Sequence, residues 1–351
     1  MSGGWSFIEH ATNYLTRPRY GDPRQPTLWP SEATALILND YGEEQVVGKC
    51  RRATFFRYMR DNYDFDTKYA FYKPLYDRIK SEAVEPSRYM RWVWIAGELY
   101  EDHLIDLAKE SGVYIAGQVS VYIKPVNVAG KCDILAINPE TNKLSFVEVK
   151  SVYGFNGDKV LGTVSERSKG KLGTPRDSNL MQIAMYHWWS ASHNQDLYED
   201  SRLVYGARDT GRYAEYKIRT AIDPETNITN IYYRGHAPNV TKEVKSPITV
   251  DSILEQYKFI QKSLDSGSIP AKDFKLQYSD DQLQALYDRK KLNKADTARH
   301  EKRAAYLSGA SKRPIKPLIK GDWECENCPF KNVCYLSTDV NSSKYAVPRD
   351  L

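Results

Sequence analysis

The chain has 351 residues, of which 41% are hydrophobic, and this composition is sufficient for a folded core in one large domain or two. Its 50 Lys and Arg residues outnumber its 45 Asp and Glu residues, so the formal net charge of +5 permits a polyanionic partner without requiring one. The chain has no run of about 18 apolar residues, no charged start followed by an apolar core and no Gly-x4-Gly-Lys-Ser/Thr loop. We therefore expect a cytoplasmic protein with no membrane partner and no recognisable nucleotide-driven motor.

The N-terminal part combines an irregular leader with a basic and aromatic run. The prolines of residues 1–30 predict the leader. Ser31 is typical of a helix N-cap and predicts a helix that continues through Ile37. Cys50 follows, and residues 51–69 are dense in Arg, Phe and Tyr. This run could stack bases and contact the phosphates of single-stranded nucleic acid, or its aromatic side chains could pack around the metal cluster to which Cys50 is expected to belong, with the arginines solvated.

A second helix is predicted over residues 88–111, with Ser87 as its N-cap. Gly97 and Glu101 lie four residues apart and therefore share one face of it. The glycine leaves space for a backbone or a ligand beside that face, so Glu101 is the preferred candidate for a group that points at a site. His103 falls in an apolar stripe and is interpreted as a core residue. The alternative for Glu101 is a solvated surface position. Residues 113–122 predict the strand that follows.

The central feature of the sequence is a predicted hairpin. Residues 132–137 and 144–150 are largely apolar, and residues 138–142 between them are Asn-Pro-Glu-Thr-Asn, which is typical of a turn. We expect the two strands to pair as antiparallel neighbours, with Ile137 opposite Leu144.

This register brings three charged side chains together. Asp133 falls opposite Glu148, with their Cβ atoms roughly 5 Å apart, and Lys150 lies on the same face two residues further on. Like charges in such a pair destabilise a hairpin unless a cation lies between them. Carboxylates with water suit magnesium or manganese, and a neighbouring lysine can orient or activate the attacking water. The alternative is an edge hairpin with an ordinary surface Asp, Glu and Lys.

The segment after the hairpin is basic. Residues 153–177 are rich in Gly, Lys, Arg and Ser, and they form either a mobile loop that contacts phosphates or an ordinary surface loop. Asp177 or Ser178 is expected to cap a helix that carries Gln182 and Tyr186 on one line. A glutamine in an otherwise apolar helix needs a hydrogen-bond partner, which a site water, a metal ligand or a phosphate would provide.

The remainder of the chain predicts further sheet and helix. Strands are expected over residues 203–207, 213–218 and 228–233, and helices over residues 252–264 and 280–307.

The cysteines are unevenly distributed. Cys325, Cys328 and Cys334 lie close together near the C-terminus, and in a cytosolic chain this spacing indicates a metal site rather than disulfides. A tetrahedral site needs a fourth ligand, for which Cys50 is the candidate. The spacing does not decide between zinc and an iron-sulfur cluster. Cys132 is interpreted as a small buried residue.

Taken together, these motifs resemble those of a known family. The chain resembles the RecB-like branch of the PD-(D/E)XK nucleases, and in particular its iron-sulfur members, which include the CRISPR-associated RecB-like exonucleases, the AddB nuclease domain and exonuclease V. The matching motifs occur in the family order and are Gly97-x3-Glu101, Gly130-Lys131-Cys132-Asp133, Glu148-Val149-Lys150, Gln182-x3-Tyr186, and Cys50 with Cys325, Cys328 and Cys334.

The resemblance implies an α/β fold with a restriction-endonuclease-like core, in which helices flank a mixed central sheet. Residues 87–270 would form the nuclease core. Residues 31–86 would form a helical N-terminal region that carries Cys50, and residues 271–351 a helical arm and a cysteine-rich tail. A structural 4Fe-4S cluster on the four cysteines would join the N-terminal region to the tail.

The resemblance also implies a metal site. Asp133, Glu148 and the Val149 carbonyl would hold Mg²⁺ or Mn²⁺, with Glu101 as a further ligand and His103 as its runner-up. Many members have His four residues after the first-motif glycine, where this chain has Glu101. This chain also has Cys rather than Pro before Asp133, at a position that faces away from the metal in an alternating strand.

By the same resemblance, Lys150 would assist the attacking water, and Gln182 and Tyr186 would support the site and the substrate. The expected function is a metal-dependent DNA nuclease, with an exonuclease preferred, that acts on single strands or duplex ends. The alternative is a nucleic-acid-binding or assembly subunit of a recombination or CRISPR-adaptation complex that does not cleave. Partner proteins from such complexes, and a homo-oligomer, remain open.

Overall fold

The computed structural model describes residues 27–62, 73–84, 88–167, 169, 171–194, 196–236 and 242–335. Most of the predicted leader lies outside these residues, as do Ser87 and the end of the basic and aromatic run. The chain divides into two compact units, Met1–Asn62 with Pro86–Pro270, and Tyr63–Glu85 with Ala271–Leu351.

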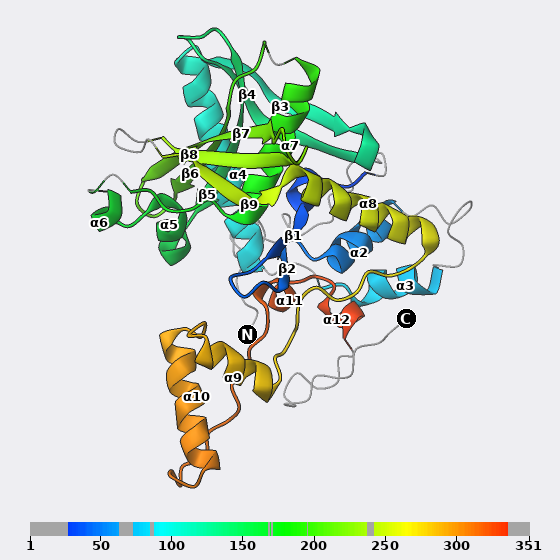
Figure 1. Ribbon diagram of the computed structural model, residues 1–351, viewed down its shortest axis with the longest axis vertical. Helices are drawn as coiled ribbons and strands as arrows, with labels where there is room; N and C mark the ends of the chain where they lie inside the picture. The colour runs from blue at the N-terminus through cyan, green and yellow to red at the C-terminus, as the bar shows by residue number, and fades with distance from the viewer. Residues whose placement is uncertain are drawn as a thin grey trace, which may run out of the picture. The chain divides into compact units, whose positions relative to one another are not determined.

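The first unit is an α/β structure built on a seven-stranded mixed sheet with the strand order β3-β4-β5-β6-β7-β8-β9 (Figure 1). Strands β5 and β6 are parallel, and the other neighbours are antiparallel. The expectation of a mixed sheet flanked by helices is confirmed. The strands are β3 (Tyr114–Ile123), β4 (Val128–Ile137), β5 (Leu144–Val152), β6 (Ser201–Ala207), β7 (Tyr213–Ile222), β8 (Thr229–Gly235) and β9 (Val244–Thr249).

Helices flank this sheet on both faces. The helices of the first unit are α2 (Arg51–Asn62), α4 (Arg88–Glu110), α5 (Gly154–Leu161), α6 (Val164–Arg167), α7 (Asp177–His193) and α8 (Val250–Ser266). Within the described residues, no helix combines the length and the hydrophobicity that crossing a bilayer requires.

The central strand β6 shows how α4 and α7 cover opposite faces. Successive side chains of a strand point to opposite faces of the sheet. The Tyr205 hydroxyl donates a hydrogen bond to Asn179 Oδ1 of α7 over 3.0 Å. The next residue, Gly206, faces Tyr100 of α4. Both faces of β6 are therefore covered, which explains why most of this strand is buried.

The second unit is mostly helical. Leu283, Leu292 and Leu318 form a small buried cluster in it. The Arg78 guanidinium donates a hydrogen bond of 2.7 Å to the Val333 carbonyl and so ties two of its helices together. Its helices are α3 (Lys73–Glu82), α9 (Asp280–Asp288), α10 (Lys294–Leu307), α11 (Trp323–Glu326) and α12 (Lys331–Cys334).

The helix predicted to begin at Ser31 is wrong. Pro30–Glu32 forms a single 3-10 turn, and the chain continues as a hairpin of β1 (Thr34–Leu38) and β2 (Glu44–Gly48). The five residues of β1 are too few to distinguish a helix from a strand by their pattern. The turn that follows contains Gly42, whose φ of 74° allows the chain to reverse and form a hairpin. The apolar run therefore pairs as a strand.

The single helix predicted over residues 280–307 is also wrong. Helix α9 ends before Lys290, which has a left-handed φ of 54°. Helix α10 then begins with Asn293 as its N-cap, whose side chain accepts a hydrogen bond from the Asp296 amide. The Asn-x-x-Asp pattern starts a new helix at this point, although the uniformly polar composition predicts one continuous helix.

The other predicted elements are confirmed with small shifts at their ends. Helices α4, α7 and α8 and strands β3 to β8 lie where the sequence placed them. Strand β9 (Val244–Thr249) was not predicted, and Pro247 within it explains why the segment lacks a strand signal. This proline lies on an edge strand of the sheet, where a missing amide is tolerated.

The described part of the basic and aromatic run fits neither of its two interpretations in full. Phe55 and Phe56 are buried in the core, so these two rings cannot stack bases. Arg52 and Arg57 are buried as well, rather than solvated. Arg57 forms an ion pair with Glu32 and lies over the Trp29 ring, 3.9 Å from its centroid. The run therefore stabilises the core of the first unit.

Substitution at Gly206 tests the packing of α4 on the sheet. A Cβ atom at this position would lie 1.7 Å from Tyr100 Oη. We expect Gly206→Ala to lower the melting temperature through overpacking that costs about 1–3 kcal/mol. Gly157→Ala in α5 is the matched control, because its Cβ would meet only ordinary contacts, the nearest at 3.5 Å. Equal melting temperatures for the two variants would contradict this packing.

Candidate active site

The predicted hairpin forms with the expected register. Strands β4 and β5 are antiparallel, and Ile137 pairs with Leu144. The ladder continues for four pairs, as far as Ile134 and Val147. Asp133 and Glu148 would form the next pair, so the two carboxylates lie at the point where the ladder ends.

The Asp133 side chain accepts a backbone hydrogen bond at the point where the ladder of β4 and β5 ends. The backbone amide of Val149 donates a hydrogen bond of 2.8 Å to Asp133 Oδ2. A carboxylate thus accepts the hydrogen bond that a carbonyl would accept in a regular strand pair. Asp133 is 7% exposed, so this charge-assisted bond holds it in a fixed position inside the sheet.

Glu148 is the most deeply buried acid of the site, at 1% exposure. Lys150 lies on the same face, as predicted, and its ammonium forms an ion pair with Glu148 Oε1. The Gln182 side-chain amide donates a second hydrogen bond of 2.7 Å to the same oxygen. The prediction that Gln182 needs a polar partner is therefore confirmed, and the partner is a predicted metal ligand.

Tyr186 lies one turn after Gln182 on α7. Its hydroxyl donates a hydrogen bond of 3.1 Å to the backbone carbonyl of Lys131 on β4. The tyrosine is buried, and a side-chain hydrogen bond also links it to Gln182, which in turn binds Glu148. It therefore holds α7 against β4, close to the acidic group of Asp133.

Glu101 approaches Asp133 from α4, and the preference for this residue over His103 agrees with the structure. Glu101 is half-buried, whereas His103 is exposed. The interpretation of His103 as a core residue is wrong, because the part of α4 that carries it lies at the surface. A side-chain hydrogen bond links Glu101 to Asp133.

Gln118 is a site residue that the sequence did not reveal. On β3 it lies opposite Asp133, between the pairs Gly117–Ile134 and Val119–Cys132. Its side-chain amide donates a hydrogen bond of 2.8 Å to Glu101 Oε1. Its φ of 51° is in the left-handed region that favours glycine, a kind of strain that often occurs at functional sites. No motif marks such a residue, because its role depends on a backbone irregularity.

The surroundings of Glu101, Asp133 and Glu148 disfavour the charged form of each carboxyl group. Burial, with repulsion from Asp133, raises the pKa of Glu148 to about 8, although Lys150 opposes the shift. Burial and the charge of Asp133 raise the pKa of Glu101 to about 7. Burial also raises the pKa of Asp133, against the opposing effect of Lys150. One ammonium group therefore does not compensate fully for three carboxyl groups.

A divalent cation fits this donor set. Glu148 Oε2 is completely buried and has no hydrogen-bond partner among the described residues. An unpaired, buried carboxylate oxygen is costly, and a cation would satisfy it. In the part of the chain that the structure describes, no group of three or more His, Cys, Asp or Glu side chains could hold a metal ion. Mg²⁺ is often bound by only one or two carboxylates with water and phosphate, so Asp133 and Glu148 are sufficient as side-chain ligands. The assignment of the Val149 carbonyl as a further ligand stays a prediction, whereas Glu101 does not form a three-carboxylate metal group with Asp133 and Glu148 in the described structure.

The structure describes all of the predicted cluster cysteines but shows no cluster-forming group. Cys50 belongs to the first unit, whereas Cys325, Cys328 and Cys334 belong to the second. Cys334 is buried, and the other three are half-buried. Among the described residues, no set of three thiols is arranged as a metal site. The 4Fe-4S cluster thus stays a prediction. Cys132 is buried, as expected for a small core residue.

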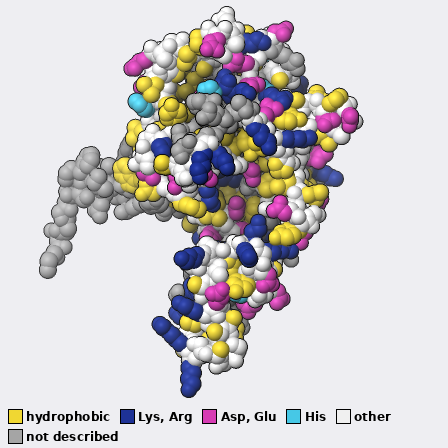
Figure 2. Space-filling view, turned by 60° about the vertical axis from the view of Figure 1, so that its left-hand side comes forward, with side chains coloured by type: hydrophobic (Ala, Val, Ile, Leu, Met, Phe, Trp, Pro, Cys, Tyr) yellow, Lys and Arg dark blue, Asp and Glu magenta, His cyan; other side chains and the backbone are white. Residues whose placement is uncertain are grey.

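The basic segment after the hairpin is partly helical. Residues 153–177 contain α5 and α6, so only part of this segment is a loop. Among the side chains of this segment whose exposure the structure describes, Lys159, Lys169, Lys171 and Arg176 are exposed. Over the face of the molecule in Figure 2, Lys and Arg side chains are interspersed with acidic and hydrophobic ones.

Comparison of the chain with protein-family models finds no match, and comparison with curated protein sequences finds none either. The resemblance to RecB-like nucleases thus depends on the ordered motifs alone.

The raised pKa values predict how stability depends on pH in the metal-free protein. A carboxyl group with a higher pKa in the folded chain binds its proton more tightly there, so the free energy of unfolding falls as pH rises. For Glu148 the fall spans the window from 4.5 to about 8. Lys150 adds nothing in this window, because its pKa lies above 10.5. We expect the melting temperature in EDTA to decrease across this range.

Glu148→Gln provides the matched comparison for this pH dependence. The amide cannot titrate, so this variant should show a clearly flatter dependence of melting temperature on pH. Added Mn²⁺ should stabilise the wild-type protein more at about pH 8 than at about pH 6, because metal-bound carboxylates must be deprotonated. The same slope in both proteins would show that Glu148 does not titrate in this window.

Proposed function

We propose that this chain is a metal-dependent phosphodiesterase that hydrolyses DNA, most simply an exonuclease. The observation that carries the proposal is the buried Glu148 carboxylate, which has one unsatisfied oxygen and lies beside Asp133 and Lys150 at the end of a hairpin. This is the order of side chains in the Asp and Glu-x-Lys motifs of the RecB-like nucleases. The seven-stranded mixed sheet flanked by helices agrees with such a core.

The metal would be held by two carboxylates from neighbouring strands. Asp133 and Glu148 are the proposed side-chain ligands, with the Val149 carbonyl as a backbone ligand. A bound Mg²⁺ or Mn²⁺ would polarise a phosphoryl oxygen and lower the pKa of a water molecule. Asp133 is prepared for this role, because its bond to the Val149 amide fixes the carboxylate within the sheet.

The remaining side chains orient water and ligands. The Lys150 ammonium contacts Glu148 and is partly exposed, so it is in a position to hold a hydroxide or a phosphate oxygen near the carboxylates. Gln182 keeps the Glu148 carboxylate in one orientation through its hydrogen bond. Tyr186 fixes the helix that carries Gln182 to the strand that carries Asp133.

DNA is the proposed substrate because the chain has a net charge of +5 and presents exposed lysines soon after the hairpin. Such side chains contact phosphates without reading sequence. The second candidate, a nucleic-acid-binding subunit without cleavage, retains the same surface. The intact set of Asp133, Glu148 and Lys150 favours catalysis, since binding alone does not require buried carboxylates.

A digestion assay tests the proposal directly. End-labelled single-stranded, end-labelled duplex and circular DNA are incubated with the full-length protein and Mg²⁺ or Mn²⁺. We expect Asp133→Asn and Glu148→Gln to abolish cleavage, and Lys150→Ala to lower the rate by about 10²- to 10⁴-fold, which is typical for loss of an acid–base group.

The controls come from the same hairpin. Glu140→Gln changes an exposed carboxylate of the turn between β4 and β5, and it should leave the rate unchanged. DNA binding by Asp133→Asn is measured by gel shift, so that loss of chemistry is separated from loss of binding. Wild-type rates in both Asp133→Asn and Lys150→Ala would place any nuclease activity elsewhere. Binding without cleavage by the wild-type protein would support the second candidate.

Gln182 gives a more selective test of the site. Gln182→Leu removes the hydrogen bond to Glu148 Oε1 but keeps the helix apolar. We expect the Mn²⁺ concentration for half-maximal activity to rise by about 10- to 100-fold, because groups that orient a metal ligand contribute to metal affinity. Gln256→Leu in α8 is a control that also changes a buried glutamine. An unchanged Mn²⁺ requirement in Gln182→Leu would show that the hydrogen bond has no role in metal binding.

A further inference from the structure

A second polar pocket lies in the first unit, beyond the proposed active site. It has a volume of about 270 Å³. The C-terminal half of α7, the segment before β6 and the middle of β7 form its walls. The lining residues that determine its chemistry are His187, Tyr198, Glu199, Asp200 and Arg219. No step of the proposed nuclease reaction uses this pocket.

His187 contributes a buried polar side chain to the wall of the pocket. Its side chain is 8% exposed, and its Nδ1 lies 3.3 Å from the hydroxyl of the buried Ser201. Burial and the charge of Arg219 lower the pKa of His187 to about 4, so the ring is neutral near pH 7. Nε2 has no hydrogen-bond partner among the described residues and is not sealed from solvent, so it is available to a ligand in the pocket.

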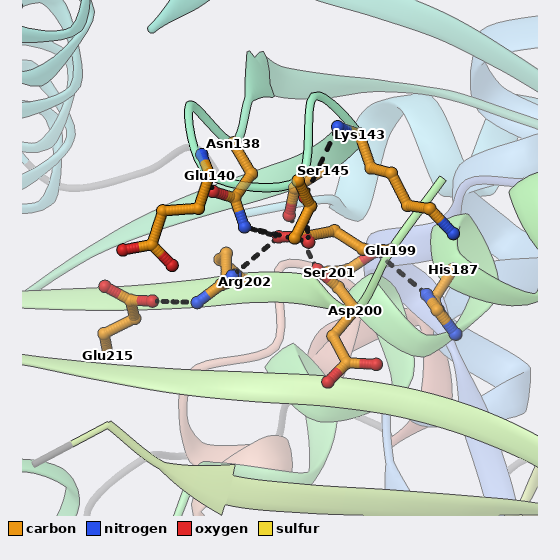
Figure 3. A network of polar contacts seen from close by, with 11 residues as sticks. Asn138, Glu140, Lys143, Ser145, His187, Glu199, Asp200, Ser201, Arg202 and Glu215 are labelled. Carbon is orange, nitrogen blue, oxygen red and sulfur yellow. Dashed lines mark hydrogen bonds and ion pairs between the residues drawn. The ribbon is translucent and has the colours of Figure 1, made fainter. Parts of the chain in front are cut away.

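Asp200 and Arg219 lie side by side at the pocket. Ser201 pairs with Ile218, so the ladder of β6 and β7 places Asp200 opposite Arg219. The Asp200 carboxylate receives no hydrogen bond and forms no ion pair in the described structure, and Figure 3 shows it outside the dashed network that includes Glu199. Arg219 uses Nε and Nη2 to bind Glu243, which leaves the Nη1 hydrogens for a ligand.

These groups define the kind of ligand that fits. Asp200 repels an anion, and Arg219 repels a cation. A neutral ligand is therefore favoured if it offers hydrogen-bond donors to Asp200 and an adjacent acceptor to Arg219. The volume is below the range of about 300–1,000 Å³ that is usual for drug-sized ligands, so the ligand is small. Tyr198 adds an aromatic side chain to the wall.

We propose that this pocket binds a nucleobase, with guanine preferred. Guanine carries two N–H donor groups directly beside its O6 acceptor, which matches Asp200 next to Arg219. Arginine is also the usual partner of the guanine carbonyl oxygen in base recognition. Adenine and cytosine offer only one donor group on the corresponding edge. Thymine offers one ring N–H between two carbonyl oxygens, and a carboxylate repels these oxygens. The base could belong to a free nucleoside or to a nucleic-acid strand.

The pocket is tied to the hairpin by hydrogen bonds. Glu199 accepts hydrogen bonds from the side chains of Asn138 and Thr141 in the turn between β4 and β5. The Ser145 hydroxyl of β5 donates a hydrogen bond of 2.7 Å to the Asp200 carbonyl. Figure 3 shows Asn138, Ser145, Glu199 and Asp200 around Ser201, where β6 begins. A ligand in the pocket would therefore contact a rigid wall rather than a loose loop.

Calorimetric titration of the full-length protein tests the proposal. Guanosine, adenosine, cytidine and thymidine are titrated in EDTA into the Asp133→Asn variant, so that the result does not depend on the proposed nuclease activity. We expect guanosine to bind at least about tenfold more tightly than the other three, and Asp200→Ala to weaken it at least about tenfold. Glu225→Gln, an exposed acid in a turn, is the control and should have no effect.

A second arm distinguishes the two sources of the base. Short single strands with and without dG are titrated under the same conditions, and each variant is checked by its melting temperature. Guanosine binding that depends on Asp200 supports a free nucleoside. Binding only of the dG-containing strand, again lost in Asp200→Ala, supports a base within a strand. No binding in either arm, or binding that Asp200→Ala does not change, would overturn the proposal.

Discussion

Glu148 places an acidic side chain where water hardly reaches, at 1% exposure in the middle of a mixed sheet. A buried charge is costly unless it is paired and hydrogen-bonded. Lys150 and Gln182 supply part of that compensation, and both act on the same oxygen. The second oxygen stays unsatisfied. The arrangement of β5, of α7 and of the end of the β4–β5 ladder can be understood as the scaffold that holds this incompletely neutralised carboxylate.

The hairpin was predictable because it depends on local rules. The turn at residues 138–142 determines the register, and alternation along the strands then determines that Glu148 and Lys150 share a face. Gln182 was predictable for a different reason, since a polar side chain in an apolar helix requires a partner. The exact partner of Asp133 was not predictable. It accepts a hydrogen bond from a backbone amide, which occurs only because the regular ladder stops one pair earlier.

The residues that the sequence did not reveal depend on tertiary structure. Gln118 reaches Glu101 because the backbone at residue 118 is left-handed, and no periodic pattern encodes that. His103 lies in an apolar stripe of α4, yet it is exposed, because the sheet covers only part of this long helix. The strand of residues 34–38 was predicted as a helix, since a short apolar run is compatible with either structure until its partner strand is known.

Helix α7 links the two candidate sites. Gln182 binds Glu148, and His187 lines the second pocket five residues later, which corresponds to about 7.5 Å along a helix axis. Most of the helix between them is buried, and Tyr186 anchors it to β4. A helix held in this way does not bend easily, so a displacement of one end of α7 also displaces the other end. Any shift along its axis at His187 would change the hydrogen bond from Gln182 to Glu148 and thereby the compensation of that carboxylate.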